Sequence, residues 1–377
     1  MAAAPDWSQL PAELLHLILE CLDDTPLDRL RFRSVCSTWR SSISPFIPIH
    51  QFPFNFPPIP AASLSARSIF LIKPPPHLQT QTPWLVKIGQ DECGRNRLWH
   101  PLFRDRSIST SSPGVLDLTN LLVSDLGNEF VVAHPSTKGK VVAAAAATLQ
   151  GSMLLTIHES EKLAVFGYGD GDDERWTIMP APDMSTNYHD VSAFNGRLYA
   201  VESGGRTVVV GPDSVLEEEP FAEHYGPNTG CCYNEKFLVE SEGELLLVEK
   251  HGGFCEDIKY KYEGDNDIDE YKEGMFRVFR FGENEEDEEE NESWVHVRNV
   301  RDRVLFIGDD CAFSVSASDL GVDEGNYVVF RDDDLKSGIG VFPLDDVGWY
   351  GDGILHLLDY PGFSSLFRPP PDWAMLH

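Results

Sequence analysis

The sequence lacks any long apolar run that could cross a membrane. Its longest purely apolar stretch, Val141 to Ala147, is far shorter than a bilayer-spanning helix. The first residues, Met1 to Trp7, have neither the basic start nor the apolar core of a signal peptide. We therefore expect a protein of the nucleus, the cytoplasm or both, with no membrane partner.

Basic residues are also scarce. The chain has 30 Lys and Arg against 61 Asp and Glu, which gives a formal net charge of −31. Between Asp213 and Glu292 there are 26 acidic residues against 7 basic ones. The negative electrostatic potential of these residues repels nucleic-acid phosphates and anionic lipids, so we expect no nucleic-acid partner. Any partner attracted by charge should present a basic surface.

The cysteines do not form a pattern that indicates a disulfide framework or a metal site. There are 7, an odd number at scattered positions, which favours free thiols in a reducing compartment. The adjacent pair Cys231-Cys232 lacks the two-residue gap of a metal or redox motif. The aspartates from Asp265 to Asp269 resemble the opening of a calcium loop, but Glu270 and Phe276 replace the glycine and glutamate it needs. We expect no metal and no cofactor.

Catalytic motifs are missing as well. The sequence contains neither the GxSxG elbow of hydrolases nor a P-loop, and Lys162 stands where a zinc protease with His158-Glu159 would need its second histidine. Gly167, Gly169 and Gly171 precede no helix that could hold a phosphate. We predict that the chain is not an enzyme. An active site assembled from residues distant in the sequence is the alternative.

What the sequence does have is a dense apolar helical unit at its start, residues 5–46. Pro11 suits the first position of a helix, because its missing N–H would have no partner there. Apolar residues then recur with helical spacing at Leu14, Leu15, Ile18, Leu19 and Leu22. Thr25 and Pro26 predict the start of a second helix, and a third should run from about Cys36 to Ile43 with Trp39 at its middle.

A unit of about 40 residues is near the lower size limit for independent folding, and its leucines exceed what it can cover. Docking on another protein would bury them. Packing of the same stripe against the downstream part of this chain is the alternative.

Residues 47–82 alternate proline with phenylalanine and read as a Pro-rich linker and lead-in. From 83 to 360, short apolar or alternating runs are separated by Gly, Asp, Asn and Pro. This pattern is typical of an all-β domain, and we predict fifteen strands between Gly127 and Pro343.

We interpret residues 361–377 as a C-terminal tail. The acidic stretch 283–292 predicts a solvated loop between two strands, with contact to a basic partner as the alternative.

Weak internal repeats specify the β architecture further. Asn195-Gly196 and Glu242-Gly243 each precede a strand-like run, and the two glycines are 47 residues apart. Leu163 to Met179 and Phe276 to Val297 share the order strand, acidic turn and Trp-led strand. This spacing favours a kelch-like β-propeller with an undetermined number of blades. A β-sandwich or barrel is the alternative.

Two linked motifs in the helical unit resemble the F-box. They are Leu10-Pro11-x-Glu13-Leu14-Leu15-x-x-Ile18-Leu19 and Arg31-Phe32-Arg33-Ser34-Val35-Cys36-Ser37-x-Trp39-Arg40. In that family the module binds the Skp-type adaptor of a cullin ubiquitin ligase. The resemblance implies that adaptor-binding residues here are Leu10, Pro11, Leu14, Leu15, Ile18, Leu19, Leu30, Val35, Cys36 and Trp39.

The downstream domain has a resemblance of its own. Val115-Leu-Asp-Leu-Thr, Phe237-Leu-Val-Glu-Ser and Cys311-Ala-Phe-Ser-Val-Ser-Ala are similar to the plant F-box family with a C-terminal kelch-related domain. Together the resemblances imply a multidomain chain, a three-helix F-box followed by the propeller, that acts as substrate receptor of an SCF-type ligase. The partners would be the adaptor, through it a cullin, and a protein target.

Two other functions stay open: an F-box interaction protein that works outside a ligase, and a propeller enzyme. Candidate target-binding loops are Gly169 to Trp176, Glu217 to Pro227, Asp265 to Gly274 and Asp309 to Cys311.

Overall fold

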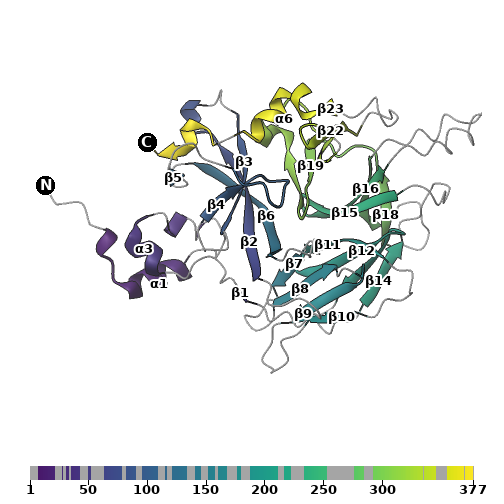
Figure 1. The fold of residues 1–377 in the computed structure, drawn as a ribbon, viewed down its shortest axis with the longest axis horizontal. Helices are drawn as coiled ribbons and strands as arrows, with labels where there is room; N and C mark the ends of the chain where they lie inside the picture. The colour runs from purple at the N-terminus through teal and green to yellow at the C-terminus, as the bar shows by residue number, and fades with distance from the viewer. Residues whose placement is uncertain are drawn as a thin grey trace, which may run out of the picture.

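The computed structural model separates a small helical unit from a large assembly of β-sheets (Figure 1). The structure describes residues 7–21, 28, 31–33, 35–42, 50–51, 63–78, 82–90, 96–108, 115–116, 121–133, 141–145, 152–157, 160–167, 176–179, 187–210, 216–221, 233–252, 276–283, 292–333, 335–344, 355–368 and 370–376. No helix among them is long and apolar enough to cross a membrane.

The helical unit begins with the short 3-10 helix η1 (Trp7–Gln9), followed by α1 (Ala12–Glu20) and α3 (Ser37–Ser42). Pro11 directly precedes α1, and its carbonyl oxygen accepts hydrogen bonds from the backbone N–H groups of Leu14 and Leu15, at 3.1 and 3.2 Å. Asp28 and residues 31–33 are also helical. The predicted start of the second helix, at Thr25 and Pro26, lies outside the described residues.

The largest sheet has nine strands in the described part of the chain and consists of two antiparallel groups. The first group, called here the first sheet, has the order β6-β2-β3-β4, with β1 on β2; the second has the order β7-β8-β9-β10. The described residues pair β6 with β7 at one position, Phe130 with Val141. The bounds are β1 (His50–Gln51), β2 (Ser63–Lys73), β3 (Trp84–Gln90), β4 (Asn96–Trp99), β6 (Leu122–Ala133), β7 (Val141–Ala145), β8 (Ser152–Ile157), β9 (Leu163–Gly167) and β10 (Trp176–Ile178).

Two four-stranded antiparallel sheets follow in chain order, and a five-stranded sheet, called here the last sheet, completes the set. The first two are β11 (Tyr188–Phe194), β12 (Arg197–Glu202), β13 (Arg206–Val210) and β14 (Leu216–Phe221), then β15 (Tyr233–Ser241), β16 (Glu244–Gly252), β17 (Phe276–Glu283) and β18 (Glu292–Val297). The last sheet has the order β20-β19-β21-β22-β23, and its β19 and β21 run parallel. Its strands are β19 (Arg303–Ile307), β20 (Ala312–Ser316), β21 (Tyr327–Arg331), β22 (Ile339–Pro343) and β23 (Leu355–His356).

Short elements connect and cover the sheets. Strand β5 (Val115–Leu116) pairs with the C-terminal strand β24 (Met375–Leu376). The helical elements of this part are η2 (Pro76–Leu78), α5 (Ala317–Leu320), η4 (Leu357–Asp359), α6 (Pro361–Leu366) and η5 (Asp372–Ala374).

Shared apolar cores link neighbouring sheets into a closed circuit. Leu155 and Val165 of the β7–β10 group pack with Val191 and Leu198 of the next sheet. Further cores join β11–β14 to β15–β18, and β15–β18 to the last sheet. A fourth core, with Ile69 and Phe306, joins the last sheet back to the first sheet. The sheets therefore stand around a common centre, as Figure 1 shows.

Sheets between two neighbours in the circuit bury apolar side chains on both faces. Along β12, Leu198 and Ala200 enter one core, whereas Tyr199 and Val201 enter the next. Successive side chains of a strand point to opposite faces, so a strand buried on both faces must be apolar at successive positions. This explains the continuous apolar runs in the sequence.

The repeated turns predicted from the sequence share one geometry. Asn195 and Gly196 both have positive φ, 48° and 75°, and so do Glu242 and Gly243, at 54° and 78°. Positive φ at both central positions belongs to the two-residue turn whose twist matches that of paired strands. The two turns connect β11 to β12 and β15 to β16, which are equivalent positions in adjacent sheets.

Each of the fifteen predicted strands overlaps a strand of the structure. The stretch 47–82 differs from the prediction of a linker and lead-in, because β2 occupies residues 63–73 and pairs with both β3 and β6. The neighbouring prolines concealed this strand. Within the segment 361–377 left as a tail, Phe363 and Leu366 of α6 are buried in the core that joins the last sheet to the first sheet.

His100, which follows β4, is a buried histidine at the same junction. Its ring stacks on Phe367 with centroids 5.0 Å apart, and its Nδ1 accepts a hydrogen bond from the backbone N–H of Leu102 at 3.2 Å. Burial, with Arg106 and Lys87 nearby, lowers the pKa of His100 from 6.5 to about 3. The imidazole is therefore neutral in the folded protein at neutral pH.

We expect the free energy of unfolding to fall as the pH drops from about 7 to about 5, because the unfolded chain then protonates His100 while the folded chain does not. This stabilisation is complete above pH 6.5 and is lost as the pH falls toward about 3. His100→Asn should make the decline shallower in denaturant titrations at several pH values. The exposed His77→Asn is the matched control, and an unchanged slope in His100→Asn would contradict the assignment.

Candidate functional site

The helical unit has a small core of its own. Leu15, Phe32 and Trp39 are buried, and the rings of Phe32 and Trp39 lie with centroids 4.5 Å apart. Partly buried side chains packed against these three are Leu10, Ile18, Leu19 and Cys36. Among the described residues, this cluster contains none from the sheets. The unit's inner face is thus covered by its own helices.

Polar contacts hold the parts of the unit together around that core. The indole Nε1 of Trp39 donates a hydrogen bond to the backbone oxygen of Trp7 at 2.9 Å, which fixes η1 against α3. Arg33 and Arg40 each donate to the other's backbone oxygen, at 3.2 and 3.1 Å. These bonds tie residues 31–33 to α3.

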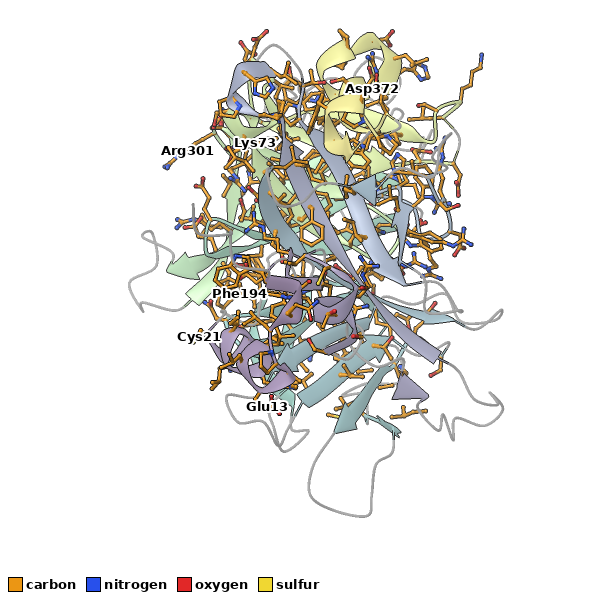
Figure 2. All side chains as sticks on the ribbon, turned by 90° about the vertical axis from the view of Figure 1, so that its left-hand side faces the viewer. Glu13, Cys21, Lys73, Phe194, Arg301 and Asp372 are labelled. Carbon is orange, nitrogen blue, oxygen red and sulfur yellow. The ribbon has the colours of Figure 1, made fainter. Side chains whose placement is uncertain are left out.

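Four large apolar side chains of the unit face solvent, and we call them the exposed apolar set. Their exposed fractions are 59% for Trp7, 45% for Leu14, 56% for Leu17 and 48% for Val35. Leu14 and Leu17 are three residues apart on α1, so they share one face of that helix. Figure 2 shows Glu13 and Cys21 at the outer edge of the same unit. Exposed apolar groups gathered on so small a unit are typical of a protein interaction site.

The residues predicted to bind the adaptor fall into three groups in the structure. Leu14, Pro11 and Val35 are exposed. Leu10, Ile18, Leu19 and Cys36 are partly buried, and Leu15 and Trp39 are buried. Leu30 lies outside the described residues. The exposed members can touch a partner directly, whereas Leu15 and Trp39 support them from inside the unit.

Sequence reasoning missed two members of the exposed apolar set, Trp7 and Leu17. Leu17 stands three residues after Leu14, and this helical spacing could have revealed a second apolar face next to the predicted stripe. Trp7 precedes the helical pattern, and only its contact with Trp39 places it on the unit.

Comparison with known proteins accounts for both parts of the chain. Residues 7–48 match the family model of the F-box domain, and residues 61–350 match that of the KIB1-4 beta-propeller. The chain is an F-box protein with a KIB1-4 β-propeller domain. The predicted fold, a helical F-box followed by a kelch-like β-propeller, is thereby confirmed.

Relatives of this F-box protein occur in Arabidopsis thaliana. It is 36% identical to the F-box protein SKIP23, over 99% of this chain and 96% of the relative. It is 31% identical to the F-box protein At2g17036, over 98% of this chain and 94% of the relative. The F-box/kelch-repeat protein At2g24250 is 27% identical, over 84% of this chain and 79% of the relative. The predicted family, plant F-box proteins with a kelch-related domain, is confirmed.

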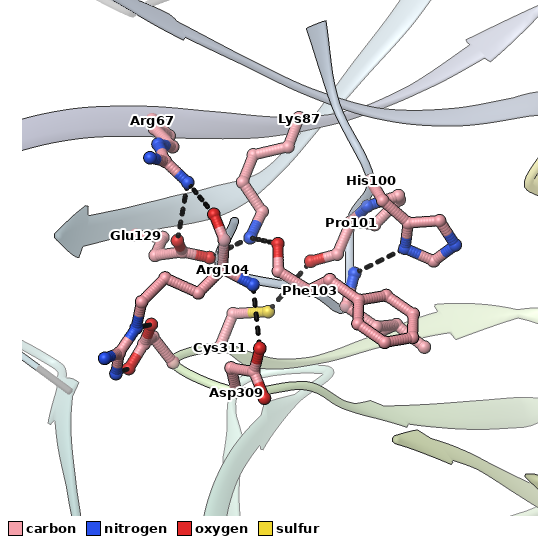
Figure 3. A network of polar contacts seen from close by, with 11 residues as sticks. Arg67, Lys87, His100, Pro101, Phe103, Arg104, Glu129, Asp309 and Cys311 are labelled. Carbon is pink, nitrogen blue, oxygen red and sulfur yellow. Dashed lines mark hydrogen bonds and ion pairs between the residues drawn. The ribbon is translucent and has the colours of Figure 1, made fainter. Parts of the chain in front are cut away.

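Within the propeller of this F-box protein, a network of buried charges joins the first sheet to the last sheet (Figure 3). Glu129 of β6 accepts a hydrogen bond from Lys87 of β3 and lies 3.7 Å from Nη1 of Arg67. The guanidinium of Arg67 also sits 3.8 Å from the centroid of the Trp99 ring. Contact with Lys87 and Arg67 offsets part of the cost of burying Glu129, but burial outweighs it and raises the pKa of this carboxyl.

The segment after β4 extends the network to the turn between β19 and β20. The side chain of Arg104 pairs with Asp310, and its backbone N–H donates to Oδ2 of Asp309 at 2.8 Å. The backbone N–H of Asp309 in turn donates to the oxygen of Leu102 at 2.9 Å. Residues Asp309 to Cys311, predicted as a target-binding loop, therefore bind the chain's own first sheet.

Cys311 and His100, next to this network, form hydrogen bonds with the backbone. The Cys311 thiol donates to the backbone oxygen of Pro101 at 3.2 Å, and His100 accepts a backbone N–H through Nδ1. Among the residues that the structure describes, no group of three or more His, Cys, Asp or Glu side chains could hold a metal ion. The described cysteines Cys21, Cys36 and Cys311 carry free thiols.

A second buried pair lies within the sheet β15–β18. Nζ of Lys236 is 2.7 Å from the carboxylate of Glu249, and both side chains are buried. Burial alone would raise the pKa of Glu249, but Lys236 and Arg277 beside it make the net shift downward. The carboxylate is therefore charged at neutral pH and serves to balance the buried lysine.

Other predicted sites are described only in part. Of the acidic stretch 283–292, the structure pairs Glu283 with Glu292 at the ends of β17 and β18, and the residues between them lie outside the described part. Of the candidate target-binding loops, Trp176 belongs to strand β10 and residues 217–221 belong to strand β14. The stretch from Asp265 to Gly274 lies outside the described residues.

We expect Leu15→Ala and Leu14→Ala to differ sharply in their effect on the F-box. Removing the buried Leu15 side chain should destabilise the unit by about 2–5 kcal/mol, because it leaves a cavity. The exposed Leu14→Ala should change its stability by less than about 0.5 kcal/mol. Hydrogen exchange of α1 in the full chain measures the effect of each substitution on stability. Equal effects would contradict the assignment of Leu15 to the core and of Leu14 to the surface.

Proposed function

We propose that this protein is the substrate-recognition subunit of an SCF-type cullin ubiquitin ligase. Its F-box would bind a Skp-type adaptor, and its propeller would bind a protein target. The observation that carries the proposal is the exposed apolar set on a helical unit whose own core is already closed. The family match supports the same partner, because the F-box implies adaptor binding in general.

The energetics suit such docking. Full burial of a Leu, Val or Trp side chain contributes roughly 1.5–3 kcal/mol, so four partly exposed anchors can offset the cost of association. Leu15, Ile18 and Trp39 would hold the anchors in place without needing to touch the adaptor. The unit thus presents an apolar surface that does not have to refold on binding.

The proposed role requires no acid, base or nucleophile from this chain. A receptor that holds a target beside a ubiquitin-charged enzyme raises their effective concentration, and this alone accelerates transfer. The buried charges of the propeller fit this role, because those described contact one another within a sheet or across a junction between sheets. We propose the nucleus, the cytoplasm or both as the site of action.

Adaptor binding can be tested by co-purification of the full chain with a Skp-type adaptor. Leu14→Asp combined with Leu17→Asp should reduce the adaptor's affinity by at least about a hundredfold, because both charges would be buried in the interface. Leu122→Asp combined with Ile178→Asp is the matched control, since these are exposed apolar residues of the propeller. Failure of the native chain to bind, or equal binding by the Leu14 and Leu17 variant, would contradict the proposal.

Recruitment of a cullin distinguishes a ligase subunit from an F-box protein that acts elsewhere. We expect the complex of this chain with its adaptor to bind a cullin and to comigrate with it in size-exclusion chromatography. Adaptor binding without cullin recruitment would favour the function outside a ligase. If the purified chain converted a small molecule, and this activity disappeared when the propeller was unfolded, the result would favour an enzyme instead.

A further inference from the structure

The first sheet and the last sheet meet where the chain does not run directly from one sheet into the next, unlike the junctions at β6–β7, β10–β11, β14–β15 and β18–β19. The first sheet contains strands only from residues 50–133, and the last sheet only from residues 303–356, within the described part of the chain. No described strand is shared between them. The two ends of the circuit must therefore be held together by side chains and by segments outside the sheets.

The C-terminal residues contact the first sheet on one face through α6. Phe363 and Leu366 are buried in a core with Ile69, Leu71 and Leu85 of β2 and β3. The same core contains side chains of the last sheet, so α6 fills the corner where the two sheets meet. Phe367, just after α6, stacks on His100 and lies with its ring centroid 6.4 Å from that of Phe306 in β19.

The same segment then reaches the opposite face of the first sheet. Phe70, Ile72 and Trp84 alternate with the residues above and lie on the other face of β2 and β3. They form a separate core with Ala374 of η5, and Trp373 packs against it. Beyond η5, β24 pairs with β5. Figure 2 places Asp372 of this segment at the same end of the molecule as Lys73 of β2.

One hydrogen bond lies where the C-terminal segment passes from one face of the first sheet to the other. The indole Nε1 of Trp84 donates to the backbone oxygen of Arg368 at 2.9 Å, and Trp84 is buried. Arg368 lies between α6, which covers one face, and η5, which covers the other. The segment therefore packs against both faces of the first sheet, and its bond to Trp84 lies at the start of β3.

We propose that residues 357–368 and 370–376 form a C-terminal clasp that closes the propeller by joining the first sheet to the last sheet. With the clasp released, the first sheet separates from the last sheet, while the junctions among β7–β10, β11–β14, β15–β18 and the last sheet persist. The pairings of Arg104 with Asp310 and Asp309 are a second contact across the same junction, and they become exposed to water when it opens.

The position of the clasp has a consequence for the F-box. The chain leaves the helical unit and enters the propeller through β1 and β2, which belong to the first sheet. The sheet that the clasp holds is therefore the one to which the F-box is directly attached. A closed clasp joins that sheet firmly to the last sheet, and an open clasp lets it move with the F-box. This proposal does not depend on which partner the F-box binds.

Hydrogen exchange of the full chain, followed by mass spectrometry, tests the clasp. Trp84→Phe keeps an aromatic ring in the core but removes the bond to Arg368, and it should speed exchange in β2, β3, β5 and β24 by about five- to tenfold. Exchange in β15–β18 should be unchanged. The matched control is Trp294→Phe, which removes the 3.1 Å bond from a buried indole to Oγ1 of Thr207 between the two four-stranded sheets. Trp294→Phe should speed exchange in β11–β14 and β15–β18 and leave exchange in the first sheet unchanged.

A chain that ends at Arg368 provides the second variant. It should show faster exchange throughout the first sheet, again without change in β15–β18. Unchanged exchange in both clasp variants would overturn the proposal, and so would an equal increase in all sheets, because the propeller would then open as one unit. If the shortened chain fails to fold, Trp84→Phe and its control still decide between these outcomes.

Discussion

The structure depends on one constraint: the sheets of the propeller carry apolar side chains on both faces, and each such face must be covered by a neighbouring sheet or by another segment of the chain. Strands such as β12 and β19 are apolar at successive positions, so a single open sheet would expose one complete apolar face to water. A closed circuit covers most of these faces, because four cores are each shared by two neighbouring sheets, while the C-terminal segment covers the remaining face of the first sheet. The circuit must also be closed between the first sheet and the last sheet. There the side chains of α6 pack against both sheets, and Arg104 pairs with Asp310.

The helical unit follows the opposite rule. It is too short to cover its leucines on all sides, and the structure divides them into an inner set around Leu15 and Trp39 and an outer set that includes Leu14 and Leu17. The inner set makes the unit a defined shape, and the outer set remains available. An F-box joined to a propeller therefore combines one domain that closes upon itself with one that leaves large apolar side chains exposed.

Buried charges in this protein belong to the architecture. Lys87 and Arg67 contact Glu129 near the junction of the first sheet and the last sheet and offset part of the cost of its burial, and Lys236 balances Glu249 within a sheet. His100 is kept neutral by burial between Phe103 and Phe367. Each of these groups would be costly to bury alone, so their pairing makes the packing of sheets specific. This accounts for polar residues in the propeller's interior without requiring a reaction.

The sequence by itself determined the F-box, the family and the strand pattern, because these depend on local spacing: Leu14 with Ile18 on one helix, and apolar runs ended by Asn195-Gly196 or Glu242-Gly243. It did not reveal β2, hidden among prolines, or β14, whose Glu217 to Pro220 has little strand propensity, because their pairing with β6 and β13 outweighs local preference. Only the tertiary structure decided which leucines of α1 face solvent, that Asp309 to Cys311 lie inside a junction, and that the C-terminal segment grips the first sheet. The first outcome depends on the packing of Leu15 with Phe32 and Trp39, and the other two on contacts between residues more than 200 positions apart. Local spacing carries no information about such contacts.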